Sequence, residues 1–491
     1  MTTANSKAPN PSGRPKKAKA ERKKRKRGQG QRKRASIEPR PVLEENAAGI
    51  DIGSREMYVA VPPDRDERPV RVFDAFTADL NALADWLVRC GVTTVAMEST
   101  GVYWIPIYEI LAARGMRPCV VNARHMKNVP GRRTDWHECQ WIQYLHSVGL
   151  LRPAFRPEAQ VCALRSVIRH RGELVQMAGK HVQHMHKALT QMNLQIQHVI
   201  SDLTGVTGLA IIDAILAGER DATVLAQLRD PRIKASLEVI QKSLVGHWQP
   251  EHLFTLKQSR RLYAEYQQQI AECDAEIERL VGSFEPVVDP QVKPLPPDQK
   301  KNRNYAKTRK KRVSSQPAKP AFDLRTELYK VYGVDVTQIP GLEFLGLQIF
   351  SEIGRDLSRW ANAAQFASWL ALCPDNDISG GRVLWRGARK AHNRAGQLFR
   401  MAAYSLDRSP TPLGDYLRRM KSKIGPQAAH TATAHKIAVI FYSMVRHQVE
   451  YDQTLWEKRD EQRRLRHTAR LKRQAERLGY RLTPMEEAPA A

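Results

Sequence analysis

The feature that most constrains the fold is a series of short apolar segments between residues 45 and 150 that alternates in a fixed order with amphipathic ones. The segments with the length and alternation of strands are 46–52, 56–62, 69–76, 93–98 and 117–122. The segments with helical spacing are 78–90, 104–114 and 135–148; in the first of these, Leu80, Leu83, Trp86 and Leu87 repeat on one face. This order predicts a mixed α/β sheet domain.

Three strands followed by helix, strand, helix, strand and helix is the order of an RNase H-like sheet. Acids occupy its key positions: Asp51 ends the first apolar run, Glu98 ends the fourth, and Asp135 and Glu138 begin the final helix, one turn apart. Four carboxylates that converge on one point repel each other unless cations lie between them. Hard oxygen ligands suit Mg²⁺ or Mn²⁺, and two such ions form the clamp used for phosphodiester chemistry. The alternative is that these are scattered surface acids, but their placement in this fold favours a metal site.

The charge balance points to a polyanionic partner. The 491 residues contain 79 Lys+Arg against 51 Asp+Glu, which gives a formal net charge of +28. Nucleic acid is the expected partner, and an acidic membrane surface is a weaker alternative. No apolar run approaches the length of a membrane span and no signal peptide is seen, so we expect a cytoplasmic, nucleoid-associated protein. The six cysteines form no CxxC pair, which argues against a zinc finger.

Two basic segments lack the composition of a folded core. Residues 1–40 contain fifteen Lys/Arg and two Glu, and predict a disordered arm in which Lys23 and Arg25 contact phosphates. A solubilising tail or a nuclear-localisation segment remains the alternative. Residues 285–320 are rich in proline and then basic, so Lys310 and Arg312 are expected to follow a phosphate backbone unless the segment is a plain linker.

Apolar residues recur every three and four positions between 161 and 200, with Arg171 as the one charged member of the series. A second, shorter series runs from Tyr263 to Leu280. The spacing predicts two long helices that pair antiparallel as a coiled coil, with short helical turns over 201–250 closing the hairpin. Part of the seam is free to face another subunit.

Residues 322–450 are predicted to be mostly helical. The sequence Ile339-Pro340-Gly341 resembles a helix-hairpin-helix turn, in which backbone N–H groups at Gly341 would face a phosphate. A simple helix connector explains it equally well. Residues 451–491 predict a basic helix or a disordered tail.

Ser379 lies in a predicted glycine-rich loop over 372–382, followed by Arg382, Arg386 and Arg389. A serine before two glycines is usually a turn residue. Guanidinium groups around a serine also support its attack on a phosphate, and the three arginines are candidate phosphate contacts. The residues alone leave both interpretations open.

Taken together, these motifs resemble the DEDD transposases of insertion sequences, the bridge-RNA-guided serine recombinases with a RuvC-like domain. The matching segments are Gly49-Ile50-Asp51-Ile52-Gly53, Met97-Glu98-Ser99-Thr100-Gly101, Arg133-Thr134-Asp135, Ile339-Pro340-Gly341 and Ile378-Ser379-Gly380-Gly381. The resemblance departs at Glu138, where the family has Asp, and in the two basic segments. It implies a basic tail (1–44), a RuvC-like domain (45–155), a coiled-coil region (156–284), a basic linker (285–321), a C-terminal transposase domain (322–450) and a second basic tail (451–491).

The resemblance also implies a mechanism. Asp51, Glu98, Asp135 and Glu138 would hold Mg²⁺ or Mn²⁺, and Ser379 would be the nucleophile for strand cleavage and exchange. Donor and target DNA would be selected by a structured noncoding bridge RNA, and the protein would act as a dimer or tetramer. Two alternatives differ in class: a metal-dependent nuclease of the Holliday-junction resolvase type that uses water, and a noncatalytic nucleic-acid-binding scaffold.

Overall fold

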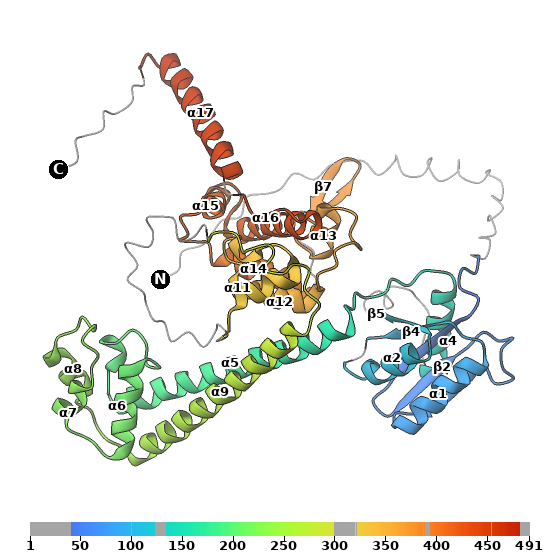
Figure 1. The fold of residues 1–491 in the computed structure, drawn as a ribbon, viewed down its shortest axis with the longest axis horizontal. Helices are drawn as coiled ribbons and strands as arrows, with labels where there is room; N and C mark the ends of the chain where they lie inside the picture. Colours follow the sequence, from blue (N-terminus) through green and yellow to red (C-terminus); the bar gives the residue numbers. More distant parts are fainter. Residues whose placement is uncertain are drawn as a thin grey trace, which may run out of the picture. The chain divides into compact units, whose positions relative to one another are not determined.

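The computed structural model describes residues 41–99, 101–122, 134–298, 320, 322–385, 387, 393–452 and 454–481. Two compact units divide the chain between Phe155 and Arg156. The first is an α/β domain and the second is mostly helical, so the fold prediction is confirmed (Figure 1). In the described part of the chain, no helix combines the length and apolarity needed to cross a membrane.

The first unit is built on one five-stranded sheet. Its strands are β1 (Ala47–Ile52), β2 (Glu56–Ala60), β3 (Val70–Asp74), β4 (Thr94–Glu98) and β5 (Arg117–Val121), in the spatial order β3-β2-β1-β4-β5. The first three strands pair antiparallel, whereas β1, β4 and β5 run parallel. The parallel pairing of β1 with β4 places the ends of these two strands side by side at one edge of the sheet.

Alternation along β1 sends successive side chains to opposite faces of the sheet. Ile50 and Ile52 join the core formed with α1 (Thr77–Arg89) and α2 (Trp104–Ala113). Gly49 and Asp51 therefore lie on the other face, which is covered by α4 (Asp135–Ser147). The apolar spacing predicted for α1 is correct, because the residues that define it are buried: Leu80, Leu83, Trp86 and Leu87.

Two 33-residue helices, α5 (Ala159–Gln191) and α9 (Pro250–Gly282), dominate the start of the second unit. They lie side by side in Figure 1 and pack antiparallel, as the spacing of apolar residues predicts. The prediction of one helix over 161–200 is wrong at its end. The helix stops at Gln191, and Asn193 has a left-handed φ of 56°, so the last apolar positions of the series belong to a turn and a short 3₁₀ segment.

Arg171 is buried in this helix pair and has a matched partner. Its guanidinium donates to both carboxylate oxygens of Asp274, with N···O distances of 2.5 and 3.1 Å. The same guanidinium lies over the ring of Phe344, with its central carbon 5.1 Å from the ring centroid. One ion pair therefore fixes the register of α5 against α9 and joins both to a third helix.

The tip of the helix pair and the rest of the second unit are helical. Near the tip lie η2 (Ile196–His198), α6 (Val206–Ala217), α7 (Ala222–Gln227) and α8 (Leu237–Leu244). The helices that follow are α11 (Leu324–Tyr332), η3 (Val336–Gln338), α12 (Glu343–Ile353), α13 (Ala363–Trp369), α14 (Arg394–Tyr404), α15 (Pro412–Ile424), α16 (Pro426–His447) and α17 (Thr454–Arg477). Two short strands, β6 (Asp377–Ser379) and β7 (Arg382–Trp385), interrupt them and form a separate hairpin.

Candidate metal centre and serine hairpin

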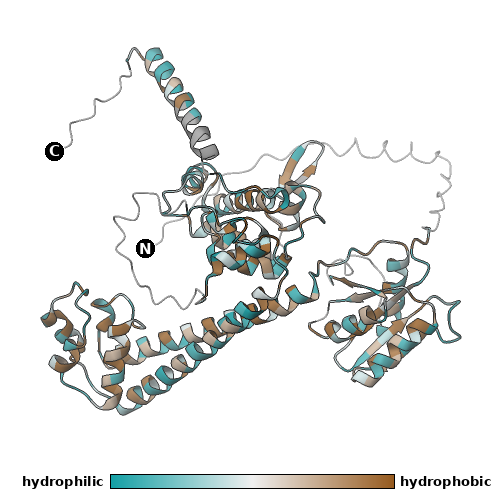
Figure 2. Cartoon of the chain, in the orientation of Figure 1, coloured by the Kyte–Doolittle hydropathy of each residue, from teal (hydrophilic) through white to brown (hydrophobic). Residues whose placement is uncertain are grey.

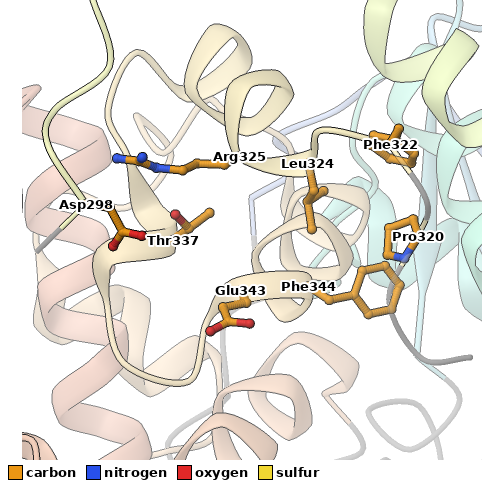
Figure 3. Close-up of a pocket in the computed structure, with 8 residues that line it drawn as sticks. All are labelled: Asp298, Pro320, Phe322, Leu324, Arg325, Thr337, Glu343 and Phe344. Atoms are coloured by element: carbon orange, nitrogen blue, oxygen red, sulfur yellow. The ribbon is translucent and has the colours of Figure 1, made fainter. Parts of the chain in front are cut away.

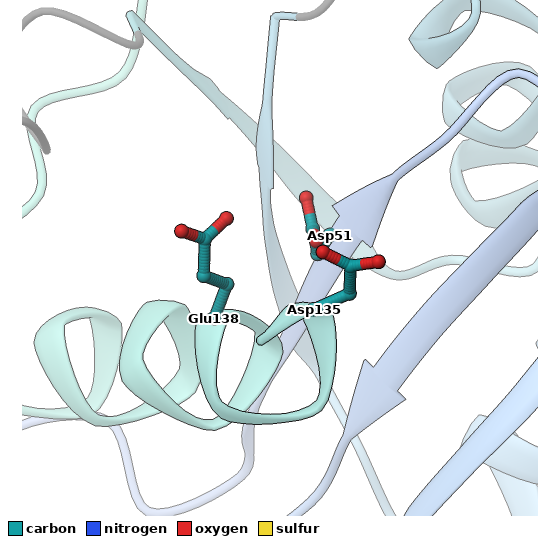
Figure 4. A group of neighbouring side chains, drawn as sticks. All are labelled: Asp51, Asp135 and Glu138. Carbon is teal, nitrogen blue, oxygen red and sulfur yellow. The ribbon is translucent and has the colours of Figure 1, made fainter. Parts of the chain in front are cut away.

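Three carboxylates of the first unit form a cluster where β1 meets the start of α4. Asp51 lies on β1, Asp135 is the first residue of α4, and Glu138 follows one turn later. One carboxylate oxygen from each lies within 4.8 Å of the other two. Figure 4 shows the three side chains beside one another between strand and helix. The structure thus brings together three of the four acids that the sequence singled out.

A glycine allows the helix to come close enough to form this cluster. A Cβ atom on Gly49 would lie 2.3 Å from the backbone nitrogen of Gln143 and 2.4 Å from the carbonyl oxygen of Cys139, both on α4. Gln143 Nε2 also donates to the Ala47 carbonyl oxygen at 3.2 Å. Because only hydrogen fits at this position, Gly49 sets the distance between Asp51 and the two acids of α4.

Negative charge on the three carboxylates is unfavourable when no cation lies between them. Burial is the largest effect that raises the pKa of Asp51 from 3.8 to about 6. The charges of neighbouring acids add to that rise, in the order Glu138, Asp135 and Glu98. A hydrogen bond from the backbone of Ile52 lowers the pKa but does not offset the rise. A site that disfavours its own negative charge in this way attracts cations.

Glu98 lies at the end of β4, the strand parallel to β1, and is half-buried. It is close enough to contribute to the raised pKa of Asp51 but is not a member of the three-carboxylate cluster. Tyr58, opposite Asp51 in the β1–β2 register, donates its phenol hydrogen to Glu56 at 3.1 Å. This hydrogen bond is the main reason that the pKa of Tyr58 is raised, with Asp135 and Asp51 contributing less. The acidic field therefore extends across the end of three strands.

The donor set fits a hard divalent cation. All three clustered groups are carboxylates, Asp135 is exposed and Glu138 is partly exposed, which leaves room for water ligands. The partial positive charge at the start of α4 stabilises the two acids of its first turn without neutralising them. Mg²⁺ and Mn²⁺ take such oxygen ligands and retain several waters.

Ser379 lies at the end of a β-strand beside the tight, glycine-rich turn that the sequence predicts, and the prediction of a loop over 372–382 missed the two short strands that flank this turn. It is the last residue of β6 and pairs with Arg382, the first residue of β7. Between them Gly380 and Gly381 have φ values of 55° and 79°, which is the requirement of a two-residue type I′ turn. Both Ser379 and Arg382 are exposed, so the hydroxyl group is presented to solvent beside a guanidinium.

The basic residues that follow the hairpin are only partly within the described residues. Arg386 and Arg389 lie outside them. Arg394, the first residue of α14, has its Nε 3.4 Å from a carboxylate oxygen of Glu352, which also accepts hydrogen bonds from Arg169. The carboxylate of Glu352 is nearly buried, and it also pairs with Arg165 of α5 at 3.6 Å. It therefore holds three arginines, two from α5 and one from α14, against α12.

The structure explains Gly341 as a packing residue. Its φ is 91°, and a Cβ atom there would lie 2.7 Å from the carbonyl oxygen of Ala402 and 2.9 Å from Ser405 Oγ, at the end of α14. The close approach of α14 requires glycine without any ligand, which favours the connector interpretation. The phosphate contact at Gly341 stays a prediction.

A pocket of about 260 Å³ opens beside the start of α12 (Figure 3). Its lining is half apolar and half polar: Asp298, Pro320, Phe322, Leu324, Arg325, Thr337, Glu343 and Phe344. None of the residues predicted from the sequence to bind metal, DNA or RNA lines it. We assign it no chemistry.

Four predicted phosphate contacts, Lys23, Arg25, Lys310 and Arg312, also lie outside the described residues. Sequence reasoning missed two residues that organise the sites, Gly49 and Glu352. Each carried a signal. A glycine inside an apolar strand marks a close backbone approach, and a single acid in the mostly apolar segment 344–353 requires a buried partner.

Two family models match the chain. A DEDD model described as "Transposase", of the IS110 type, covers residues 48–194, and the model of the "Transposase IS116/IS110/IS902 family" covers residues 335–417. The first match contains the carboxylate cluster and all of α5, and the second contains the serine hairpin. A search of curated proteins found no match.

Proposed function

Because the chain belongs to the DEDD transposases of insertion sequences, we propose that it moves DNA by RNA-guided strand cleavage and exchange, with Ser379 as the nucleophile and a divalent metal as cofactor. A transposase acts on DNA, and the net charge of +28 suits that substrate. The observation that carries the proposal is the cluster of Asp51, Asp135 and Glu138, in which burial and mutual repulsion raise the pKa of Asp51 to about 6.

In this proposal the metal ligands are Asp51, Asp135 and Glu138, with Glu98 completing the set from the neighbouring strand. The bound ion, Mg²⁺ or Mn²⁺, would polarise the scissile phosphate. The longer side chain of Glu138 supplies the carboxylate that the related transposases take from Asp.

Ser379 performs the covalent step. Its Oγ forms a bond to phosphorus, the bond from phosphorus to one sugar oxygen breaks, and the serine proton is released as that oxygen leaves and takes up a proton. The phosphoserine conserves the energy of the phosphodiester, so the reverse attack by a new strand end rejoins DNA without ATP. Arg382, paired with Ser379 across the hairpin, stabilises the charge that develops on the phosphate.

Guidance by a structured RNA accounts for the wide distribution of the charge. A protein that reads RNA shape and DNA backbone needs many phosphate contacts and few base contacts. Recombination cuts several strands together, so we propose that a dimer or tetramer assembles on the two DNA molecules.

The nuclease alternative has one observation in its favour. The three clustered carboxylates all lie in the first unit, apart in sequence from Ser379, and two-metal sites of this kind hydrolyse phosphodiesters with water alone. The two functions differ in a single chemical product, the protein–DNA adduct.

The test uses the full chain, linear DNA carrying the segments that flank its gene, and RNA transcribed from those segments. The reaction with Mg²⁺ is stopped with denaturant, and DNA-linked protein is sought on a gel. We expect an adduct in the wild type and in the control Ser99→Ala, none in Ser379→Ala, and none in the wild type with EDTA. An adduct that persists in Ser379→Ala, or cleavage that persists without any adduct, would overturn the assignment.

A further inference from the structure

The last helix, α17, has a regular row of arginines on one face. Arg466, Arg470, Arg473 and Arg477 follow one another at steps of four, three and four residues, and all four are exposed. At 100° per residue these steps return to the same side of a helix, so the four side chains start from one narrow strip. In the sequence, Arg459 and Arg463 continue the same steps toward the start of the helix.

Repulsion within the row of arginines would destabilise an isolated helix. Like charges three and four residues apart destabilise a helix by a few tenths of a kcal/mol for each pair. Among the residues that the structure describes, none of the four arginines forms an ion pair with an acid. The opposite face carries Leu471, Ala475 and Leu478 rather than compensating carboxylates. A polyanion would relieve this repulsion.

From Thr468 to Arg477 all side chains of the helix are exposed except that of Ala475, which is half-buried. Its main contact with another helix in the described part of the chain is with α15. Figure 2 shows α17 as largely hydrophilic beyond its first turns. The apolar residues opposite the row are two leucines and one alanine, and Leu465 lies on another side of the helix, so together they form no broad stripe of the kind that inserts into membranes.

We propose that the arginine row of α17, formed by Arg466, Arg470, Arg473 and Arg477, is a second DNA-binding surface that lies along the backbone of B-form duplex DNA. The row spans about 17 Å, and a lone helix of about 10–12 Å diameter fits the major groove, which is about 12 Å wide. The corresponding groove of duplex RNA is deep and narrow, so DNA is the better match. The surface lies beyond residue 417, outside both matched family domains, and goes beyond the proposed catalytic function.

The experiment measures binding of the nucleic-acid-free full chain to a 20-base-pair DNA duplex in EDTA, between about 50 and 300 mM salt. Cleavage plays no part, so failure here is distinguishable from failure of the serine mechanism. Each phosphate contact contributes about 0.9 to the slope of log affinity against log salt. Replacing all four arginines with glutamine should therefore make the slope shallower by about 3 to 4, whereas replacing all four with lysine should leave it nearly unchanged.

A composition-preserving variant separates the row from the total charge. This variant moves two arginines to the opposite face of α17 without changing charge or composition. It combines Arg470→Thr with Thr468→Arg, and Arg473→Ala with Ala475→Arg. Circular dichroism checks that helix content is retained. We expect the slope to become shallower by about 2, and a slope equal to that of the wild type would overturn the proposal.

Two further outcomes would also overturn it. An equal loss of slope on an RNA duplex of the same sequence would assign the row to RNA. A change in molecular mass by light scattering for the composition-preserving variant would assign α17 to a subunit contact.

Discussion

Replacing Asp51 with asparagine should stabilise the first unit when no metal is present. Asparagine keeps the shape of the side chain and can still accept the hydrogen bond from Ile52, but it removes the charge that burial and the neighbouring acids oppose. A pKa raised from 3.8 to about 6 corresponds to at most about 3 kcal/mol at neutral pH, at about 1.4 kcal/mol for each pH unit. Because Asp51 is only partly buried and screened by solvent, we expect about 1–2 kcal/mol.

The pH dependence follows from the direction of the shift. The folded protein holds the proton of Asp51 more tightly than the unfolded chain, so the favourable contribution of the protonated acid is complete below about pH 4 and is lost as the pH rises through about 6. The difference between the variant and the wild type should therefore be near zero at pH 4 and reach its plateau above pH 6.

The assay is amide hydrogen exchange of the full chain in EDTA, read for peptides that cover β1 and α4. The variant should show higher opening free energies than the wild type at pH 7.5, and Asp74→Asn, at the exposed end of β3, should show no change. Mg²⁺ at ten times its dissociation constant should raise the opening free energy of the wild type by about 1.4 kcal/mol. It should raise the opening free energy of the variant by much less. Lower protection in the Asp51 variant than in the wild type, in EDTA at pH 7.5, would refute the repulsive cluster.

Three other changes test the structure. Gly49→Ala should push α4 away from β1, lower the free energy of unfolding by about 1–3 kcal/mol in denaturant and weaken the protection by Mg²⁺. The control Gly172→Ala on α5, where the glycine has open space around it, should not lower the free energy of unfolding. Glu138→Asp should weaken Mg²⁺ protection in hydrogen exchange, but less than Asp51→Asn does, because a carboxylate remains; an equal loss would show that the backbone is adapted to the longer side chain. Asp274→Ala leaves a buried guanidinium without its carboxylate and should lower the free energy of unfolding in urea by about 3–5 kcal/mol. Arg171→Met combined with Asp274→Leu should restore most of that stability. A loss below about 1 kcal/mol for Asp274→Ala would contradict the buried pair.

The parts of the fold that could be predicted depend on local periodicity. The strands of the first unit follow from alternation and the α1 face from its spacing of apolar residues, and both repeat at intervals that single segments reveal. Asp51, Asp135 and Glu138 could be grouped because strand ends and the last helix of this sheet order meet at one edge.

The parts that could not be predicted depend on contacts between distant segments. The sequence shows Arg171 in an apolar series but not that Asp274, more than one hundred residues later, supplies its carboxylate. It shows Ser379 before two glycines, a pattern that predicts a tight turn but does not reveal that two strands pair on either side of it. The end of α5 at Gln191 is equally invisible, because the apolar spacing continues through the turn that follows.

Because α4 contacts β1 closely at Gly49, the position of α4 is thermodynamically linked to the affinity of the carboxylate cluster for a cation. Two of the three clustered carboxylates lie on α4, so an interaction that holds this helix against the sheet would raise the affinity for a cation. A bound cation would stabilise the same helix position by the same factor. A nucleic acid that contacts α4 would therefore control metal loading without touching a ligand. Metal binding at the cluster would then depend on whether the nucleic acid is bound.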